Sequence, residues 1–455
     1  MTIEEAYKFI EESNKYGSVL GLSSMETLLA RLGNPQEQLK FVHVAGTNGK
    51  GTTAAYISAI LAAAGYYVGR YISPAVLNKR EIIQISYKFE ASYITCNETG
   101  QKKAPELANS SIFTKYISEE DIACYIEQIQ KACISITADG LPHPTVFEIE
   151  TAMSFLYFLD SNCDIVVLEV GLGGRLDATN VINTVECAVL TSISMDHMHI
   201  LGNTLEQITR EKAGIIKPGI TVVSYDQKPE ARKIIEEVCK EMEANVTFAD
   251  FNNVKIEEQD LKGTIFSYEE WKHLHINMLG ENQVKNAVIA MLAIKALQRS
   301  GYSITEEDIY IGLLNARWRG RFEILKREPL FIVDGAHNED AAASLAKNIN
   351  IYLKNKKIIY IMGVLADKDY DAVLRHTGKY ASAILTITPN NSRGLSSKVL
   401  AEAASQYCST VYDCNRVSEA TKMAYNIAGK NDVILAFGSL SYLEEVYQAL
   451  DITIK

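Results

Sequence analysis

The sequence lacks the cysteine pattern of a disulfide-stapled or zinc-binding protein, since its eight cysteines never form a Cys-x-x-Cys pair. They lie mostly among apolar residues, as free thiols do in a reducing compartment. An excess of basic residues is also missing: 45 Lys and Arg against 56 Asp and Glu give a net charge of −11. This charge argues against broad nucleic-acid binding. Small anionic ligands stay compatible with it, because helix ends and a few lysines bind them locally.

Targeting and membrane signals are missing as well. The N-terminal segment, residues 1–6, has neither the basic nor the apolar block of a signal peptide. The most apolar long stretch, residues 54–72, is interrupted by Gly65, Gly69 and Arg70, which predicts a buried helix and not a membrane span. We therefore expect a cytoplasmic protein without nucleic-acid or membrane partners, and we expect a monomer.

Short apolar runs alternate with longer helical patterns along the 455 residues. Continuous apolar runs suit strands that are buried on both faces of a parallel sheet, with helices as crossovers. The pattern predicts a doubly wound α/β protein. The runs that predict strands are Phe41–Ala45, Ile165–Val170, Ala188–Thr191, Thr221–Ser224, Phe331–Val333, Ile358–Met362, Ile384–Ile387 and Val433–Phe437.

Two breaks interrupt this rhythm. The segment of about residues 86–118 is polar and predicts an insertion, although Ser86–Cys96 could also pair as a hairpin. The second break lies near Asn315–Arg321, after which strands and helices alternate again. We expect a large N-terminal domain, residues 1–316, and a smaller C-terminal domain, residues 317–455.

The clearest motif is Gly46-Thr-Asn-Gly-Lys-Gly-Thr52, between a predicted strand and an alanine-rich helix. Glycines let successive N–H groups point at phosphate oxygens, and the helix N-terminus favours negative charge. Lys50 would reach the β- and γ-phosphates, and the Thr52 hydroxyl would bind Mg²⁺. The spacing departs from the strict P-loop, because Val44 stands where its first glycine would be and Gly51 follows the lysine. A glycine-rich turn without a ligand is the alternative. The predicted ATP-binding residues of this loop are Gly46, Thr47, Asn48, Gly49, Lys50, Gly51 and Thr52.

This motif resembles the phosphate loop of the folylpolyglutamate synthases and dihydrofolate synthases, a branch of the Mur ligase superfamily. Gly51 favours this branch, because the cell-wall Mur ligases usually have threonine or serine after the lysine. The resemblance implies a large N-terminal doubly wound sheet domain of the P-loop type and a smaller Rossmann-like C-terminal domain that binds glutamate and closes over ATP. Further motifs match in family order: Leu32-Gly-Asn-Pro35, Ser73-Pro74, Phe147-Glu148, Leu168–Val181, Asp196-His197, Arg210–Lys217, Asp334–Asn338 and Leu365–Asp369.

The resemblance implies that Ser73, Glu148 and His197 bind magnesium together with Thr52, and that two ions are present. The residues alone leave other roles open. Ser73 precedes Pro74 and could be a turn residue, and Glu148 could serve a helix dipole. An imidazole is an unusual ligand for Mg²⁺, which prefers oxygen.

Lys212 matches the lysine that is carbamylated in the family, which would turn its cation into a carboxylate-like magnesium ligand. An ordinary surface-helix lysine is the alternative. We expect Lys50, Glu148, His197 and Lys212 to be the catalytic residues. Asp177 and Asn180 would orient the glycine-rich loop Gly171–Arg175 beside the metal site.

The C-terminal part carries further matches to nucleotide-binding positions. Arg321 would bracket phosphate oxygens, Asp334 would accept hydrogen bonds from ribose hydroxyls, and His337 would contact phosphate or ribose. Arg321 could instead be a solvated linker charge and Asp334 a helix cap. Asn286 matches an adenine-side position. The candidates for binding glutamate carboxylates are Lys368, Arg393 and Ser439.

Several positions depart from the family pattern. Ala75 follows Ser-Pro where an aromatic residue or histidine is common, and Arg80-Glu81-Ile82 lacks the arginine that usually follows the glutamate. Glu339 replaces the usual proline after His-Asn. The first two departures, together with the insertion of about residues 86–118, bear on substrate preference more than on ATP chemistry.

The sequence thus predicts an ATP- and Mg²⁺-dependent ligase that adds L-glutamate to the γ-carboxylate of tetrahydrofolate through an acyl phosphate, with dihydropteroate as a further candidate substrate. One alternative is a Mur-type ligase for another acid and amino acid. Another is a P-loop ATPase switch, in which Glu169 would serve the metal. A switch would hydrolyse ATP without an amine acceptor, whereas a ligase requires one.

Overall fold

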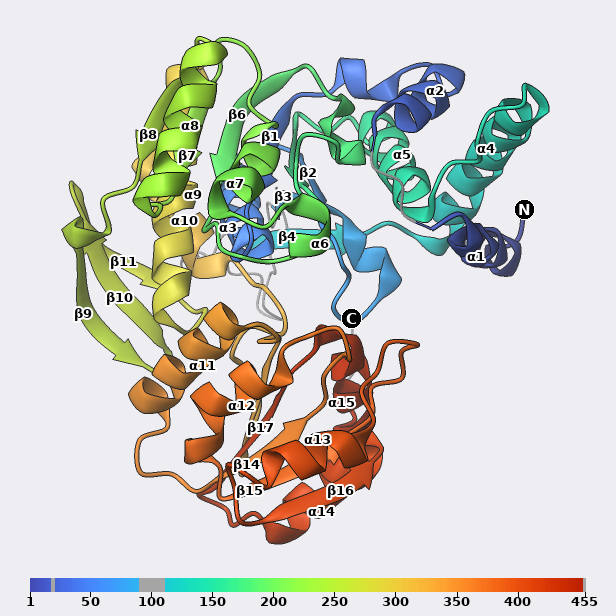
Figure 1. Ribbon diagram of the computed structural model, residues 1–455. Coiled ribbons are helices and arrows are strands. Elements are labelled where there is room, and N and C mark those ends of the chain that lie inside the picture. The colour runs from blue at the N-terminus through green and yellow to red at the C-terminus, as the bar shows by residue number, and fades with distance from the viewer. Residues whose placement is uncertain (18–20, 90–110, 453–455) are drawn as a thin grey trace, which may run out of the picture.

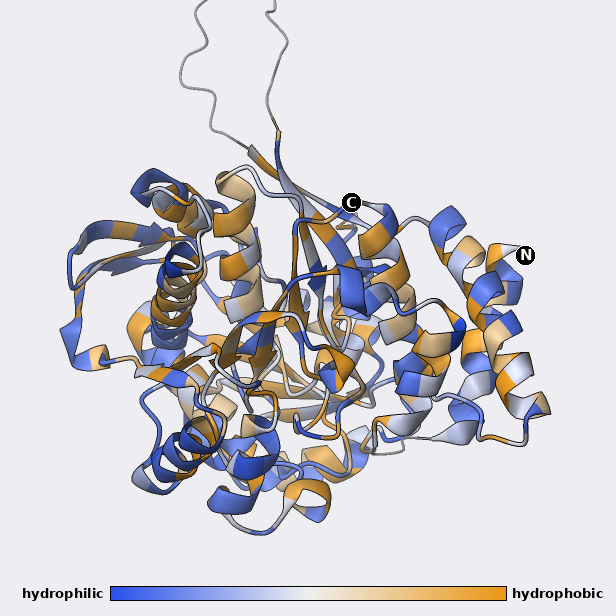
Figure 2. Ribbon diagram, turned by 90° about the horizontal axis from the view of Figure 1, so that it is seen from above, coloured by the Kyte–Doolittle hydropathy of each residue, from blue (hydrophilic) through white to orange (hydrophobic). Residues whose placement is uncertain are grey.

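The computed structural model describes residues 1–17, 21–89 and 111–452, which form two lobes (Figure 1). The large lobe contains an eight-stranded and a three-stranded sheet, and the small lobe contains a six-stranded sheet. The predicted α/β class is confirmed. Seen from above, apolar residues gather on the strands at the centre, and the surrounding helices carry polar outer faces (Figure 2).

The eight-stranded sheet is parallel except for β3, which runs antiparallel to both of its neighbours, β2 and β4. Its central strands are buried on both faces, which explains why they read as continuous apolar runs. In spatial order its strands are β4 (Ser111–Tyr116), β3 (Ile83–Phe89), β2 (Val68–Tyr71), β5 (Ile165–Glu169), β1 (Phe41–Ala45), β6 (Val185–Leu190), β7 (Thr221–Ser224) and β8 (Asn245–Phe248).

One prediction in this lobe is wrong. Residues 54–72 are not a single helix: α3 ends at Ala63, the chain turns at Gly65 with φ +93°, and β2 follows. Gly65 adopts this left-handed conformation easily because it has no Cβ. The helices of the large lobe are α1 (Ile3–Glu12), α2 (Ser23–Arg31), α3 (Lys50–Ala63), α4 (Glu119–Ala138), α5 (Val146–Asp160), α6 (Met198–Leu201), α7 (Leu205–Ala213), α8 (Pro229–Glu241), α9 (Glu281–Arg299) and α10 (Glu306–Asn315).

The three-stranded sheet lies at the edge of the large lobe (Figure 1). Its strands are antiparallel and run in the order β11 (Trp271–Ile276), β10 (Gly263–Tyr268) and β9 (Val254–Asp260). The sequence analysis did not predict this sheet. Its outer strand β9, Val-Lys-Ile-Glu-Glu-Gln-Asp, has no continuous apolar run.

The small lobe is a parallel sheet with one antiparallel edge strand, β12, and helices cover both faces. Its strand order is β12 (Glu323–Arg327), β13 (Leu330–Asp334), β17 (Val433–Phe437), β14 (Ile358–Met362), β15 (Ala383–Ile387) and β16 (Val411–Asn415). Its helices are α11 (Glu339–Tyr352), α12 (Tyr370–Thr377), α13 (Ser397–Ala404), α14 (Val417–Ile427) and α15 (Leu443–Ala449).

The expected insertion of residues 86–118 begins and ends inside the large sheet, because β3 and β4 pair there as antiparallel neighbours. Residues 90–110, which include most of the hairpin proposed for Ser86–Cys96, lie outside the described residues. In the part of the chain that the structure describes, no helix is both long and apolar enough to cross a membrane.

Candidate active site

The glycine-rich loop connects the carboxyl end of β1 to the first residue of α3. Gly46 and Gly49 have φ values of +151° and +93°, which favour glycine. A Cβ on Gly49 would lie 2.5 Å from Oδ1 of Asn286. The loop is tied to the segment that follows β6, because the Thr47 N–H donates to the Ser192 carbonyl at 2.7 Å. Thus the predicted loop has the strand–turn–helix setting that phosphate binding requires, and Asn286 lies against it.

Two lysines converge on this loop. Lys50 Nζ lies 3.4 Å from the Gly46 carbonyl oxygen, and Lys212 Nζ donates to the same oxygen at 3.0 Å. Burial, followed by the neighbouring charge of Lys50, lowers the pKa of Lys212 to about 7. Lys212 is therefore a buried amine at the phosphate loop and not the surface lysine of the alternative interpretation.

Glu169, at the carboxyl end of β5, faces these cations. Its Oε1 lies 3.9 Å from Lys50 Nζ. Burial raises the pKa of Glu169 to about 7, although Lys50, Arg321 and the backbone N–H of Ser73 act in the opposite direction. The sequence analysis considered Glu169 only for an ATPase switch. Its place at the end of a strand next to β1 was the signal that could have identified it.

The loop after β6 brings His197 to the same region. His197 has φ +49°, its N–H donates to Asp196 Oδ1 at 2.9 Å, and burial lowers the pKa of its imidazole, as do the charges of Lys368, Lys212 and Lys50. The ring is thus neutral near pH 7, the form that a metal ligand requires. Asp196, which the sequence analysis did not select, lies 3.7 Å from Lys368 Nζ of the small lobe.

Glu148 lies at the start of α5, where it forms a capping box with Thr145. Its Oε2 accepts hydrogen bonds from the Thr145 N–H at 2.7 Å and from the Thr145 hydroxyl at 2.9 Å. The helix-terminus role that the residues alone left open is therefore present, and Oε1 is the oxygen that takes no part in it. Within the described residues, no three His, Cys, Asp or Glu side chains gather as a metal-binding group.

The small lobe reaches the loop through the segment after β13. Asp334 is partly buried, and this burial raises the pKa of its carboxyl, while Arg321 acts against this shift. Its oxygens accept from the N–H groups of Phe322 and Ala336, both at 2.8 Å. Asn338 Nδ2 lies 3.5 Å from Oδ1 of Asn48 in the phosphate loop. Both lobes therefore border the loop.

His337 and the three glutamate-binding candidates differ in their surroundings. Burial lowers the pKa of His337 to about 4, and Lys368 and Arg321 lower it further. Arg393 is exposed and pairs with Asp367 at 3.3 Å, and the Ser439 hydroxyl bonds to that of Ser441. Of the three candidates, Lys368 is the one whose contacts join it to the residues around the phosphate loop.

Trp318, in the connection between the lobes, packs on the phosphate loop. A Cβ on Gly51 would lie 2.5–3.1 Å from three atoms of the indole, so glycine is required for this close contact. The Arg70 guanidinium lies 5.6 Å from the centroid of the same ring. Neither Trp318 nor Arg70 was selected from the sequence, because the contact joins residues far apart in the chain.

Asp177 fixes the glycine-rich loop after β5, as predicted from its place in the motif. One carboxylate oxygen accepts from the Leu172 N–H at 2.8 Å, and the other accepts from the N–H and hydroxyl of Thr179.

We expect Asp177→Asn to lower the free energy of unfolding by about 1–3 kcal/mol, because an amide N–H₂ would replace one buried acceptor. Denaturant unfolding tests this. Asp413→Asn, at an exposed site on β16, should leave the midpoint unchanged, and equal midpoints for both variants would contradict the prediction.

Comparison with known proteins gives the same family that the sequence motifs indicate. The Mur ligase middle domain matches residues 122–294, and the Mur ligase glutamate ligase domain matches residues 320–440. The dihydrofolate synthase/folylpolyglutamate synthase of Bacillus subtilis is 32% identical over 463 residues, covering 98% of this chain and 99% of the relative. The folylpolyglutamate synthase of Lacticaseibacillus casei is 34% identical over 380 residues, covering 81% of each chain.

Solved structures agree with the sequence relatives. The folylpolyglutamate synthase of Thermotoga maritima superimposes with a TM-score of 0.81 at 31% identity, covering 99% of this chain and 98% of that one. An Escherichia coli relative, solved with DHPP and ADP, gives a TM-score of 0.81 at 29% identity, covering 98% and 97%. The chain therefore belongs to the folylpolyglutamate synthase/dihydrofolate synthase family of Mur ligases.

Proposed function

We propose that the protein is an ATP-dependent ligase that joins L-glutamate to the γ-carboxylate of a folate. Tetrahydrofolate is the leading substrate, and dihydropteroate is the second, because relatives are named for both synthase activities. The observation that carries the proposal is the convergence of Lys50 and Lys212 on the Gly46 carbonyl, at a loop that both lobes border, in a chain of this family.

The reaction would proceed in two steps. A carboxylate oxygen of the folate attacks the γ-phosphorus of ATP, the bond to the ADP oxygen breaks, and an acyl phosphate forms. The amine nitrogen of glutamate then attacks the acyl carbon, and phosphate leaves as the amide forms and the amine loses a proton. Both steps concentrate negative charge, so Lys50 at the start of α3 would stabilise the transferred phosphoryl group.

We propose that two Mg²⁺ ions bind at this site. Thr52, Ser73, Glu148 and His197 would hold them together with the carbamate of Lys212. The oxygen donors of Thr52, Ser73 and Glu148 suit Mg²⁺, which binds few protein groups besides phosphates and water, and Glu148 keeps Oε1 outside its capping box. When bound, magnesium would neutralise part of the negative charge of the phosphates.

Carbamylation of Lys212 is supported by the state of its amine. Carbon dioxide reacts with the neutral amine, and a pKa of about 7 leaves a large neutral fraction at physiological pH. The carbamate would place negative charge near Lys50, because Lys50 and Lys212 both approach the same carbonyl oxygen.

The remaining assignments concern the other ATP contacts, the glutamate site, the domain boundary, the location and the oligomeric state of the protein. We propose that Asn286, Arg321, Asp334 and His337 bind ATP, and that Lys368, with Arg393 and Ser439, binds the carboxylates of glutamate. We keep the domain boundary at residues 316/317, a cytoplasmic location and a monomer as part of this proposal. The two matched Mur ligase regions, which end at 294 and begin at 320, support that boundary.

Product analysis with an isotope label tests the mechanism. Folate labelled with heavy oxygen in its γ-carboxylate is incubated with MgATP, L-glutamate and the protein. We expect a product heavier by one glutamyl residue and one labelled oxygen in the released phosphate. Unlabelled phosphate would contradict the acyl phosphate. Phosphate release without L-glutamate would favour the ATPase switch, and a product only with another acid would favour a different Mur-type ligase.

A further inference from the structure

We propose that Val76 and Leu77 form a plug that couples the small lobe to Ser73, with Glu81 as the residue that holds the plug in position. The inference rests on the proposed ligase function, and it adds positioning residues that lie outside the nucleotide loop. All three residues belong to the connection between β2 and β3 in the large lobe.

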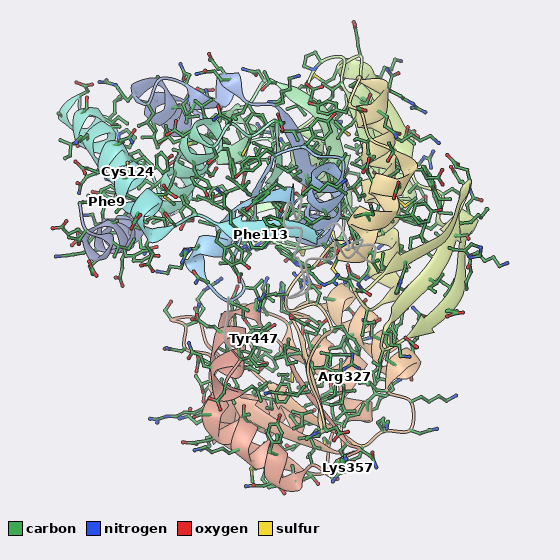
Figure 3. The ribbon with its side chains drawn as sticks, turned by 180° about the vertical axis from the view of Figure 1, so that it is seen from behind. Phe9, Phe113, Cys124, Arg327, Lys357 and Tyr447 are labelled. Atoms are coloured by element: carbon green, nitrogen blue, oxygen red, sulfur yellow. The ribbon has the colours of Figure 1, made fainter. Side chains whose placement is uncertain are left out.

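The plug is buried in the apolar cluster of the small lobe. Val76 and Leu77 are 7% and 3% exposed, and they share a cluster with Phe331 and Tyr442 of that lobe. A Cβ on Gly320 would lie 3.2 Å from Val76 Cγ1 and 2.9 Å from Leu443 Cδ1, so the side chains of both lobes meet there. Tyr447, another member of the cluster, lies at the end of the small lobe that faces the large lobe (Figure 3).

The connection is braced as a rigid unit. Glu81 Oε2 accepts hydrogen bonds from the N–H groups of Val76 at 3.0 Å and Leu77 at 3.1 Å. At the base, the Ile72 N–H donates to the Ile82 carbonyl at 3.0 Å. Glu81 is 3% exposed, and its other oxygen, Oε1, is buried without a partner. Retaining a buried carboxylate with an unpaired oxygen is costly, and here it fixes two backbone donors at the tip of the connection.

Ser73 lies at the other end of this unit. Its N–H is one of the groups that interact with the carboxylate of Glu169, which in turn lies 3.9 Å from Lys50 Nζ. A movement of the small lobe therefore acts on the plug and, through the braced connection, on Ser73 and Glu169 beside the phosphate loop. In enzymes that close over their substrates, such a contact allows closure to complete the site.

The test compares Leu77→Ser with Leu450→Ser. Leu450 is a matched control, because it belongs to the same cluster, is 6% exposed and comes from the small lobe itself. We expect Leu77→Ser to lower kcat for ligation by about tenfold while the affinity for AMPPCP stays unchanged. Leu450→Ser should destabilise the small lobe and leave kcat near that of the unmodified protein. Equal effects of both variants on kcat would overturn the proposal.

Glu81→Ala leaves the apolar cluster intact and is the second variant. We expect it to lower kcat as Leu77→Ser does, and Glu81→Gln, which keeps one acceptor oxygen, to recover activity.

Hydrogen exchange of residues 71–82 gives a readout that needs no ligase activity: AMPPCP should slow it in the unmodified protein and not in Leu77→Ser. Slowing in both would overturn the coupling. Failure of the unmodified protein to ligate any folate would count against the proposed function. The hydrogen-exchange result would then still decide whether the plug couples the small lobe to Ser73.

Discussion

We expect Lys50→Ala to abolish detectable product formation. The expected loss is at least about 10³-fold in kcat/KM, or about 4 kcal/mol of transition-state stabilisation. Lys50 is the first residue of α3, and its Nζ lies between the Gly46 carbonyl at 3.4 Å and Glu169 at 3.9 Å. Its removal takes a cation from the predicted phosphate position and leaves the buried Glu169 without its nearest counter-ion.

The measurement is steady-state turnover with MgATP, tetrahydrofolate and L-glutamate. Lys131→Ala is the control, because Lys131 lies on α4 with a side chain 71% exposed, and this variant should keep full activity. Lys50→Arg keeps the charge and tests the geometry, since a guanidinium is larger and planar. Near-normal turnover of Lys50→Ala would remove the phosphate-loop assignment.

Lys212→Ala is the second change with a large expected effect. We expect turnover to fall by roughly 10²-fold or more, as for the loss of an electrostatic group in an active site, and added short-chain carboxylates such as acetate to restore part of it. The buried space left by the side chain would admit a small carboxylate, which would replace the carbamate as a ligand. Lys212→Ala should retain nucleotide, because the N–H groups of the phosphate loop are unchanged.

Lys217→Ala is the matched control for this rescue. Lys217 follows on the same segment, and its Nζ donates to the Asn180 carbonyl at 3.0 Å, a contact within the fold of the large lobe. Its loss should weaken stability without any rescue by carboxylates. A carbamate signal in carbon NMR after labelled bicarbonate is added should be present in the unmodified protein and absent from Lys212→Ala. Full activity of Lys212→Ala would refute the carbamate.

The parts of the site that could be predicted are those formed by residues close together in the sequence. The phosphate loop needs a strand, glycines and a helix start in succession, and residues 41–63 supply all three. The Asp177 loop is likewise defined within a few residues of its own partners. Parallel strands in the interior were recognised for the same reason, because burial on both faces leaves a continuous apolar run.

The parts that were missed depend on contacts between distant segments. Trp318, in the connection between the lobes, packs on Gly51, and Val76 and Leu443, which come from different lobes, both lie near Gly320. Neither contact has a local pattern, since Trp318, Val76 and Leu443 each resemble ordinary apolar side chains in the sequence. β2 was missed because only the short turn at Gly65 separates its four residues from the buried helix α3, and the apolar pattern continues from one element into the other.

Release of ADP by the purified protein tests the central claim most directly. MgATP and L-glutamate are supplied with tetrahydrofolate, with dihydropteroate or with no pterin, and each mixture is repeated without L-glutamate. We predict ADP release that requires both a pterin substrate and L-glutamate. In the presence of L-glutamate, release with tetrahydrofolate but not with dihydropteroate marks a dedicated polyglutamate synthase. Release with either pterin marks a bifunctional enzyme. ADP release that is equally fast without pterin and without L-glutamate would contradict the ligase.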